Sequence, residues 1–143
     1  AALPEVIKAG KWLSSTGEGI VAHVARDDVA KAAAGALLDA GSKSRILNVT
    51  GPHGLTRRGI ANVVTAVTGK PIEVVDVDDD GLRAGYIQAG LPAETAAFLA
   101  AFDTNTRVGR TAIVSDAVQL LWGTPPQSLA EFLEAHRHAL LAA

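Results

Sequence analysis

The stretch Ile46-Leu47-Asn48-Val49-Thr50-Gly51-Pro52-His53-Gly54 decides how this chain is interpreted. Its pattern is that of an apolar strand entering a glycine turn, and a helical pattern follows from Thr56 to Val67. That order begins a dinucleotide-binding unit, in which backbone N–H groups and a helix N-terminus face a phosphate. The alternative is a strand that leaves through an ordinary turn into a surface helix.

The spacing of the glycines favours the ordinary turn. Gly51, Gly54 and Gly59 give G-x-x-G-x-x-x-x-G, which is not the spacing of a dinucleotide fingerprint. If Thr56 caps the helix, Gly59 lies inside it and not at its start. Pro52 also removes an N–H where a phosphate loop needs donors. A phosphate site at this turn stays open as the weaker alternative.

Composition excludes several classes of function. The chain has 143 residues, a formal net charge of −2 and no cysteine, so disulfides, thiolate metal sites and cysteine nucleophiles are excluded. No basic run indicates a nucleic-acid face, and no apolar run or leader indicates a membrane or secretory protein. We therefore expect a cytoplasmic location. The absence of methionine fits a chain that begins inside a longer protein.

Helices and a few short strands account for most of the sequence. We expect helices over 3–13, 27–40, 56–68, 78–89, 92–102, 115–121 and 128–140, strands over 20–25, 45–50, 72–77 and 111–114, and a polar loop over 103–110. The expected N-caps include Asp27 or Asp28, Ser115 and Ser128, the last in a capping box with Glu131. Phe98, Leu99 and Phe102 are expected in the core. Three or four short strands are too few for a compact parallel sheet. The pattern is typical of the carboxyl-terminal part of an α/β protein whose strands extend a sheet supplied elsewhere.

Several catalytic arrangements have no support in the sequence. The four histidines lack metal-ligand spacing, and no G-x-S-x-G motif is present. The only tyrosine, Tyr86, is followed four residues later by Gly90, so the Tyr-x-x-x-Lys pair of short-chain dehydrogenases is not available. The acidic run from Asp76 to Asp80 favours helix capping over cation binding.

Candidate substrate contacts lie in three segments. An aromatic side chain near a loop and a charged loop residue are what a planar ligand such as a quinone would use. On these grounds the candidates are Trp12, His23 and Arg107. The alternatives are a core role for Trp12, a hydrogen-bonded structural role for His23 and a solvated charge at Arg107.

Several short motifs, each weakly specific alone, together resemble one family. They are Asp27-Asp28-Val29-Ala30, Asn48-Val49-Thr50-Gly51-Pro52, Thr68-Gly69-Lys70-Pro71, Ala89-Gly90-Leu91-Pro92 and Gly123-Thr124-Pro125-Pro126-Gln127-Ser128-Leu129. In order and spacing the chain resembles the carboxyl-terminal half of NmrA-like atypical short-chain dehydrogenases, nearest the type 2 NAD(P)H:quinone oxidoreductase branch.

The resemblance implies an architecture and an activity. Residues 1–143 would form a single domain, the substrate-binding half of a Rossmann-like protein, without the nucleotide-binding half and its glycine-rich loop. The family implies hydride transfer from NADPH to an electron-poor acceptor such as a quinone, bound between the two halves. The resemblance implies that the Trp12 segment, the segment from His23 to Asp27 and the loop from Asp103 to Arg107 could face this acceptor. These regions add Arg26, Asp103 and Asn105 to the candidate substrate contacts. Because such transfer needs little acid–base machinery, the missing Tyr-x-x-x-Lys is consistent with it.

The resemblance also leaves alternatives. Alone, the chain should hold NADPH poorly and be inactive, and an uncovered sheet edge predicts self-association or pairing with the missing half. A non-catalytic redox-sensing or partner-binding module is the second hypothesis, and a structural domain without a ligand is the third.

Overall fold

The computed structural model describes residues 3–39 and 44–142. As the sequence predicted, these residues are mostly helical and contain a few short strands. The elements are α1 (Leu3–Ala9), β1 (Lys11–Ser14), β2 (Ile20–Val21), α2 (Arg26–Leu38), β3 (Leu55–Thr56), α3 (Arg57–Thr68), β4 (Glu73–Asp76), α4 (Asp79–Gln88), α5 (Ala93–Arg107), α6 (Ala117–Trp122), α7 (Leu129–Ala135) and α8 (Arg137–Ala142).

The strands form two small sheets. β1 and β4 pair in parallel, with Ser14 beside Asp76, and β2 and β3 pair antiparallel. The prediction that the first helix continues through Trp12 is therefore wrong. The helix ends at Ala9, and Trp12 lies in β1, which pairs with β4. Of the strand expected over 20–25, only Ile20 and Val21 form a strand. The segment 45–50 forms no strand. A strand needs a neighbour for its backbone groups, and the described residues supply none for 45–50.

The core forms around α3. The Thr56 hydroxyl accepts a hydrogen bond from the N–H of Gly59 at 3.1 Å, which confirms the expected N-cap. Gly69 ends the helix with φ of 72°, a left-handed conformation that suits glycine. The apolar stripe of α3 packs against α1 and α7. The buried core side chains are Ile7, Ile60, Val64, Val67 and Leu133.

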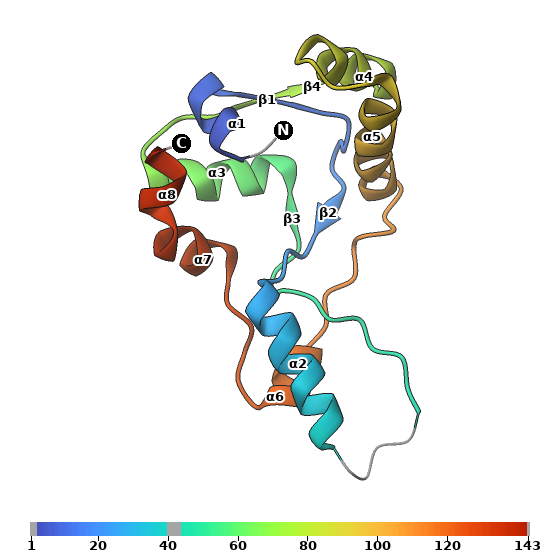
Figure 1. The fold of residues 1–143 in the computed structure, drawn as a ribbon, viewed down its shortest axis with the longest axis vertical. Coiled ribbons are helices and arrows are strands. Elements are labelled where there is room, and N and C mark those ends of the chain that lie inside the picture. The colour runs from blue at the N-terminus through green and yellow to red at the C-terminus, as the bar shows by residue number, and fades with distance from the viewer. Residues whose placement is uncertain (1–2, 40–43, 143) are drawn as a thin grey trace.

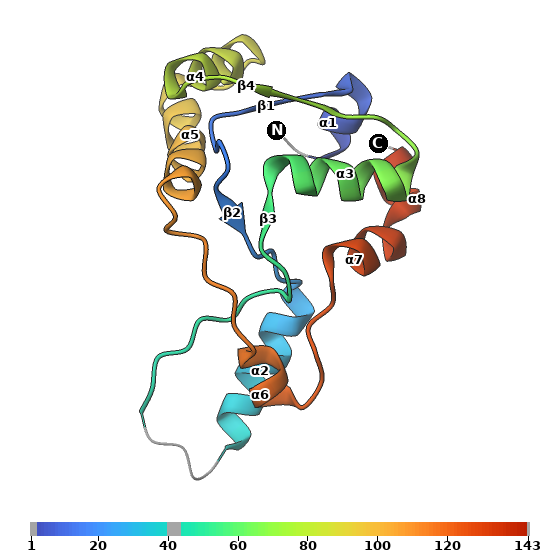
Figure 2. The same cartoon turned by 180° about the vertical axis from the view of Figure 1, so that it is seen from behind.

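The helices are arranged in an elongated molecule (Figure 1). At one end, α1, α3, α7 and α8 surround the core, with α4 and α5 beside them. At the other end α2 packs closely on α6, as the view from behind also shows (Figure 2). Gly35 permits this contact, because a Cβ at that position would lie 2.0 Å from the carbonyl oxygen of Leu121.

Helix α5 differs most from expectation. It runs to Arg107 through the segment expected to be a loop, and Pro92 is its N-cap and not its first residue. Phe98 and Phe102, expected in the core, are 65% and 55% exposed. The buried stripe of α5 consists instead of small and polar side chains, namely Ala96, Ala100, Asp103 and Thr106.

Two expected N-caps are also different. Asp116, and not Ser115, precedes α6, and Ala25 precedes α2 without a side-chain cap. Asp28 is buried instead, where it accepts hydrogen bonds from Lys31 and from the backbone N–H of Gln127. Among the described helices, none has the length and apolar character needed to cross a membrane.

Candidate functional site

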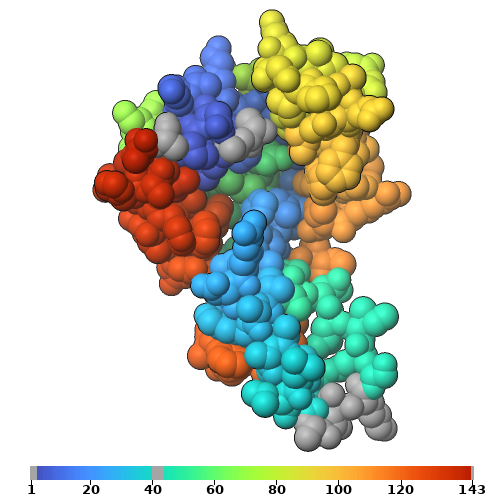
Figure 3. Space-filling model, viewed as in Figure 1, coloured from blue at the N-terminus to red at the C-terminus, as the bar shows by residue number. Residues whose placement is uncertain are grey.

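A pocket of about 670 Å³ opens beside the core, between α1, α3, α7 and the start of α2. The space-filling view shows the surface hollowed where these segments meet (Figure 3). Three of the candidate residues, Trp12, His23 and Arg26, line it together. The other lining residues are Leu3, Val24, Ala25, Asp27, Arg57, Ile60, Val64, Gln127, Ser128, Leu129, Phe132, Leu133 and His136. We call this the Trp12 pocket.

Each candidate reaches the Trp12 pocket from a different element. Trp12 lies on β1, His23 follows β2, and Arg26 is the first residue of α2. The opposite wall is the apolar stripe of α3 and the start of α7, so the pocket combines an apolar lining with a few polar groups. His136 stacks on Phe132 with a ring separation of 4.3 Å and closes this wall.

Arg57 is a lining residue that the sequence did not indicate. It is the first residue of α3, and its Cζ lies 4.6 Å from the centre of the Trp12 ring, a cation–π arrangement. Its Nη2 atom donates to Oδ1 of Asp103 at 2.7 Å. No local sequence signal indicates either partner, because Arg57 is far from both along the chain.

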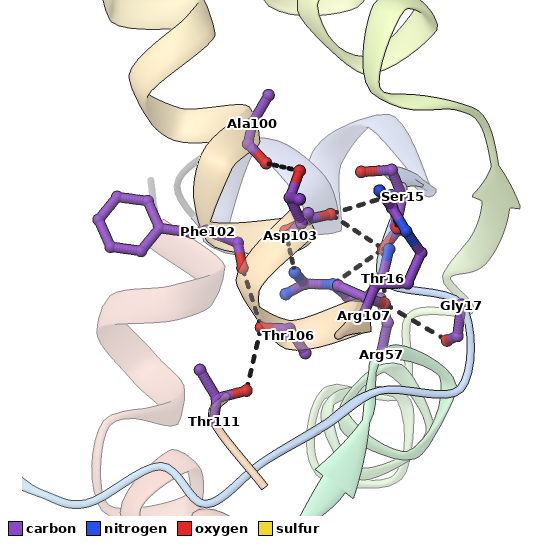
Figure 4. A network of polar contacts seen from close by, with 12 residues as sticks. Ser15, Thr16, Gly17, Arg57, Ala100, Phe102, Asp103, Thr106, Arg107 and Thr111 are labelled. Atoms are coloured by element: carbon purple, nitrogen blue, oxygen red, sulfur yellow. Dashed lines mark hydrogen bonds and ion pairs between the residues drawn. The ribbon is translucent and has the colours of Figure 1, made fainter. Parts of the chain in front are cut away.

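Asp103 lies behind Arg57 and not in the pocket lining. Its carboxylate is buried and also accepts hydrogen bonds from the Ser14 hydroxyl at 3.1 Å and the Ser15 N–H at 3.0 Å. Figure 4 shows Asp103 on α5 pointing toward Ser15 and Arg57, while Phe102 points away. The structure thus places Asp103 as a partner of Arg57.

Arg107 lines a different pocket, of about 810 Å³, between the β1–β2 turn, α4 and α5. Its two terminal nitrogens each bind Asp79 at 2.7 Å, and Nη1 also donates to the carbonyl of Ser15 at 2.6 Å. The Arg107 hydrogen bonds hold the pKa of Asp79 well below its usual range. Asn105 is half-buried and accepts from Arg110 at 3.1 Å. The structure does not bring Asn105 or Arg107 to the Trp12 pocket.

The acidic run beside that second pocket is used in capping and ion pairs. Asp78 caps α4, Asp80 pairs with Arg83, and Asp76 pairs with Arg58. Within residues 3–39 and 44–142, no group of three or more acidic, histidine or cysteine side chains is placed to hold a metal ion.

The pKa of His23 is lowered from its ordinary value of 6.5, which favours the neutral ring. The residue is exposed to solvent, but its ring lines the Trp12 pocket, where partial loss of surrounding water lowers that pKa. The positive charge of Arg57 lowers the pKa further. Arg57 therefore supplies a fixed positive charge, and His23 supplies a neutral ring with one donor and one acceptor.

Comparison with known proteins finds relatives along almost the whole chain. An uncharacterised oxidoreductase, YesF, of Bacillus subtilis is 32% identical over 127 residues, which is 89% of this chain and 44% of that protein. Quinone oxidoreductase 2 of Escherichia coli is 28% identical over 131 residues, 92% of this chain and 46% of that protein. No family model matches the chain.

Solved structures agree with these relatives. The NADPH complex of quinone oxidoreductase 2 from Escherichia coli superposes with a TM-score of 0.88 at 26% identity, covering 96% of this chain and 48% of that one. The Citrobacter triphenylmethane reductase with NADP(H) superposes with a TM-score of 0.84 at 26% identity, covering 93% of this chain and 46% of that one. The chain spans about half the length of the curated relatives it matches. The chain belongs to the NmrA-like reductase family and corresponds to the carboxyl-terminal half of its members.

Proposed function

We propose that residues 1–143 form the substrate-binding half of an NAD(P)H-dependent oxidoreductase that passes hydride to a quinone-like or other electron-poor acceptor. The Trp12 pocket carries this proposal. It combines an indole ring, a cation above that ring and a largely apolar opposite wall, which together suit a flat ligand. The relatives named above, a quinone oxidoreductase and a dye reductase, support an acceptor of this kind.

The turn from Gly51 to Gly54 does not fit the phosphates of NADPH. The N–H of Gly51 is buried and donates to the carbonyl of Ala22 at 3.3 Å, and Pro52 has no N–H to offer. A phosphate cradle needs several free N–H groups at such a turn. In our proposal the cofactor is therefore held by a nucleotide-binding half, and this chain supplies the acceptor side.

An apolar surface near α2 is where that other half would pack. The extended segment 44–50 runs beside α2, and Ile46 within it is 98% exposed. A groove of about 440 Å³ lies between this segment and α2. An extended, exposed and apolar segment is the expected edge of a sheet whose remaining strands lie elsewhere. These features support the proposed single domain with a missing neighbour.

Quinone-dependent oxidation of NADPH tests the proposal. The protein tested must carry these residues together with a nucleotide-binding half. We expect NADPH to be consumed only when a quinone such as menadione is present. Because Trp12 forms the aromatic wall, Trp12→Ala should lower kcat/KM about tenfold or more. Trp122→Phe, at an exposed position on α6, should leave it unchanged.

A redox-sensing or partner-binding module is the alternative. In that case NADPH would bind without being consumed in the presence of menadione or any other planar acceptor. This result would contradict the reductase and support the sensing module.

A further inference from the structure

Arg57 places a positive charge at a fixed position in the Trp12 pocket. The guanidinium lies over the Trp12 ring at 4.6 Å, and the side chain is only 17% exposed. A charge in a partly desolvated wall interacts more strongly with a ligand than a charge on the open surface does. The residue is thus well placed to discriminate between ligands by their charge.

The position of this guanidinium is set from behind. Nη2 donates to Asp103 at 2.7 Å, and Nε approaches the Ser14 hydroxyl at 3.4 Å. Asp103 is itself held by Ser14 and by the Ser15 N–H, so the pair is fixed from two segments. Within residues 3–39 and 44–142, Nη1 has no hydrogen-bond partner, and its N–H groups remain available to a ligand.

The other charges of the pocket offset one another. Apart from the imidazoles of His23 and His136, the remaining ionisable side chains among the described lining residues are Arg26 and Asp27, adjacent residues of opposite sign that are both exposed. The lowered pKa of His23 favours its neutral imidazole. The carboxylate of Asp103 partly neutralises Arg57, but it lies on the far side of the guanidinium from the pocket. The pocket therefore presents the positive end of the Arg57–Asp103 pair.

We propose that Arg57 makes the Trp12 pocket select planar ligands that carry a carbonyl oxygen or a negative charge and disfavour planar cations. This inference rests on the proposed function, because it assumes that the Trp12 pocket is the acceptor site. It also refines that function, since it chooses neutral and anionic quinones over cationic dyes among electron-poor acceptors.

The chain contains its own reporter for this selectivity. Trp12 and Trp122 are the two tryptophans, so Trp122→Phe leaves Trp12 as the single tryptophan, which can be excited without Tyr86. Three two-ring probes of similar size differ in charge: the anion of lawsone, neutral menadione and the N-methylquinolinium cation. Saturable quenching of Trp12 gives a Kd for each. We expect lawsone to bind about tenfold or more tightly than N-methylquinolinium.

Two variants shift the selectivity in opposite directions. Arg57→Gln combined with Asp103→Asn removes both charges without leaving an unpaired buried carboxylate, and the Kd ratio should fall to about one. Asp103→Asn alone leaves Arg57 uncompensated, and the ratio should rise. Arg58→Gln is the matched control, because Arg58 is the next residue on α3 but pairs with Asp76 and Glu18 outside this pocket. It should leave the ratio unchanged.

The outcomes separate the inference from the proposed function. If all three probes bind with the same Kd, or if the double variant keeps the selectivity, Arg57 is not the selective residue and the inference is overturned while the pocket stands. If none of the probes quenches Trp12 saturably, both the acceptor pocket and the inference are overturned.

Discussion

The Cα of Gly51 faces the backbone carbonyl of His23 so closely that a β-carbon on residue 51 would lie 1.8 Å from that oxygen. The glycine at this turn therefore has a packing cause. It lets the turn before β3 cross directly over the backbone that carries His23 into the Trp12 pocket.

We predict that Gly51→Ala destabilises the fold by at least about 2 kcal/mol, because the clash is with backbone atoms that cannot rotate away. Gly59 provides the matched control. A β-carbon there would meet its nearest neighbour at 3.5 Å, and the position lies within α3. Gly59→Ala should stabilise the fold by about 0.5–1 kcal/mol. Denaturant unfolding measures both, and equal free energies for the two variants would contradict this account of the turn.

Asp28 should be more important for stability than its position at a helix start suggests. It is 2% exposed and accepts hydrogen bonds from Lys31 at 2.9 Å and from the Gln127 N–H at 2.7 Å, which joins α2 to the segment before α7. Asp28→Ala should cost about 2–3 kcal/mol in the free energy of unfolding. Asp27→Ala, at the exposed neighbour, should change it by no more than about 0.5 kcal/mol. Similar losses in both variants would show that the buried carboxylate has no special role.

His23 should make the fold less stable as the solution becomes acidic. Its pKa in the folded chain lies below the ordinary value of 6.5, because partial desolvation in the pocket wall and then the positive charge of Arg57 disfavour the charged ring. Protons therefore bind the unfolded chain more readily, and stability falls as pH drops from about 6.5 through the lowered pKa. His23→Gln should remove this part of the pH dependence. The carboxylates whose pKa is lowered, such as Glu131, act only at lower pH, below 4.5.

Titration of the imidazole by NMR tests the same prediction residue by residue. In the Arg57→Gln, Asp103→Asn variant the pKa of His23 should rise, because the second cause of its depression is gone. An unchanged pKa would mean that the guanidinium does not reach His23.

Local signals made part of the fold predictable. The helices α3 and α7 were expected with their caps because Thr56 and the Ser128–Glu131 capping box act within a few residues. The segment 45–50 was expected to be a strand from its apolar pattern, but pairing depends on a neighbour that the described residues do not provide. A local sequence pattern predicts the secondary structure that a segment favours, but it does not predict which other segments lie beside it in the fold.

The same limit applies to the site. Trp12, His23 and Arg26 were predicted as substrate contacts and share a pocket, although substrate contact itself stays a prediction. Arg57 was missed because its contacts with Trp12 and Asp103 are made across the fold. On α5, hydrophobicity indicated Phe98 as a core residue, whereas Phe98 is 65% exposed and the small side chain of Ala96 is buried.

The exposed apolar surface predicts self-association of the isolated chain. Ile46 is 98% exposed and Leu37 on α2 is 87% exposed, and uncovered apolar surface of this kind favours contact with another copy. Light scattering should give a molar mass above 14.7 kDa that rises with concentration. Ile46→Lys should lower it. A mass of 14.7 kDa at every concentration would contradict the prediction.

The most direct test of the central claim is a pair of titrations on the Trp122→Phe chain, one with menadione and one with NADPH. If the chain is the acceptor half, menadione quenches Trp12 to saturation, and NADPH shows no tight binding because the Gly51 turn does not hold its phosphates. Tight binding of NADPH together with quenching by menadione that never saturates would contradict the assignment of this chain to the acceptor side.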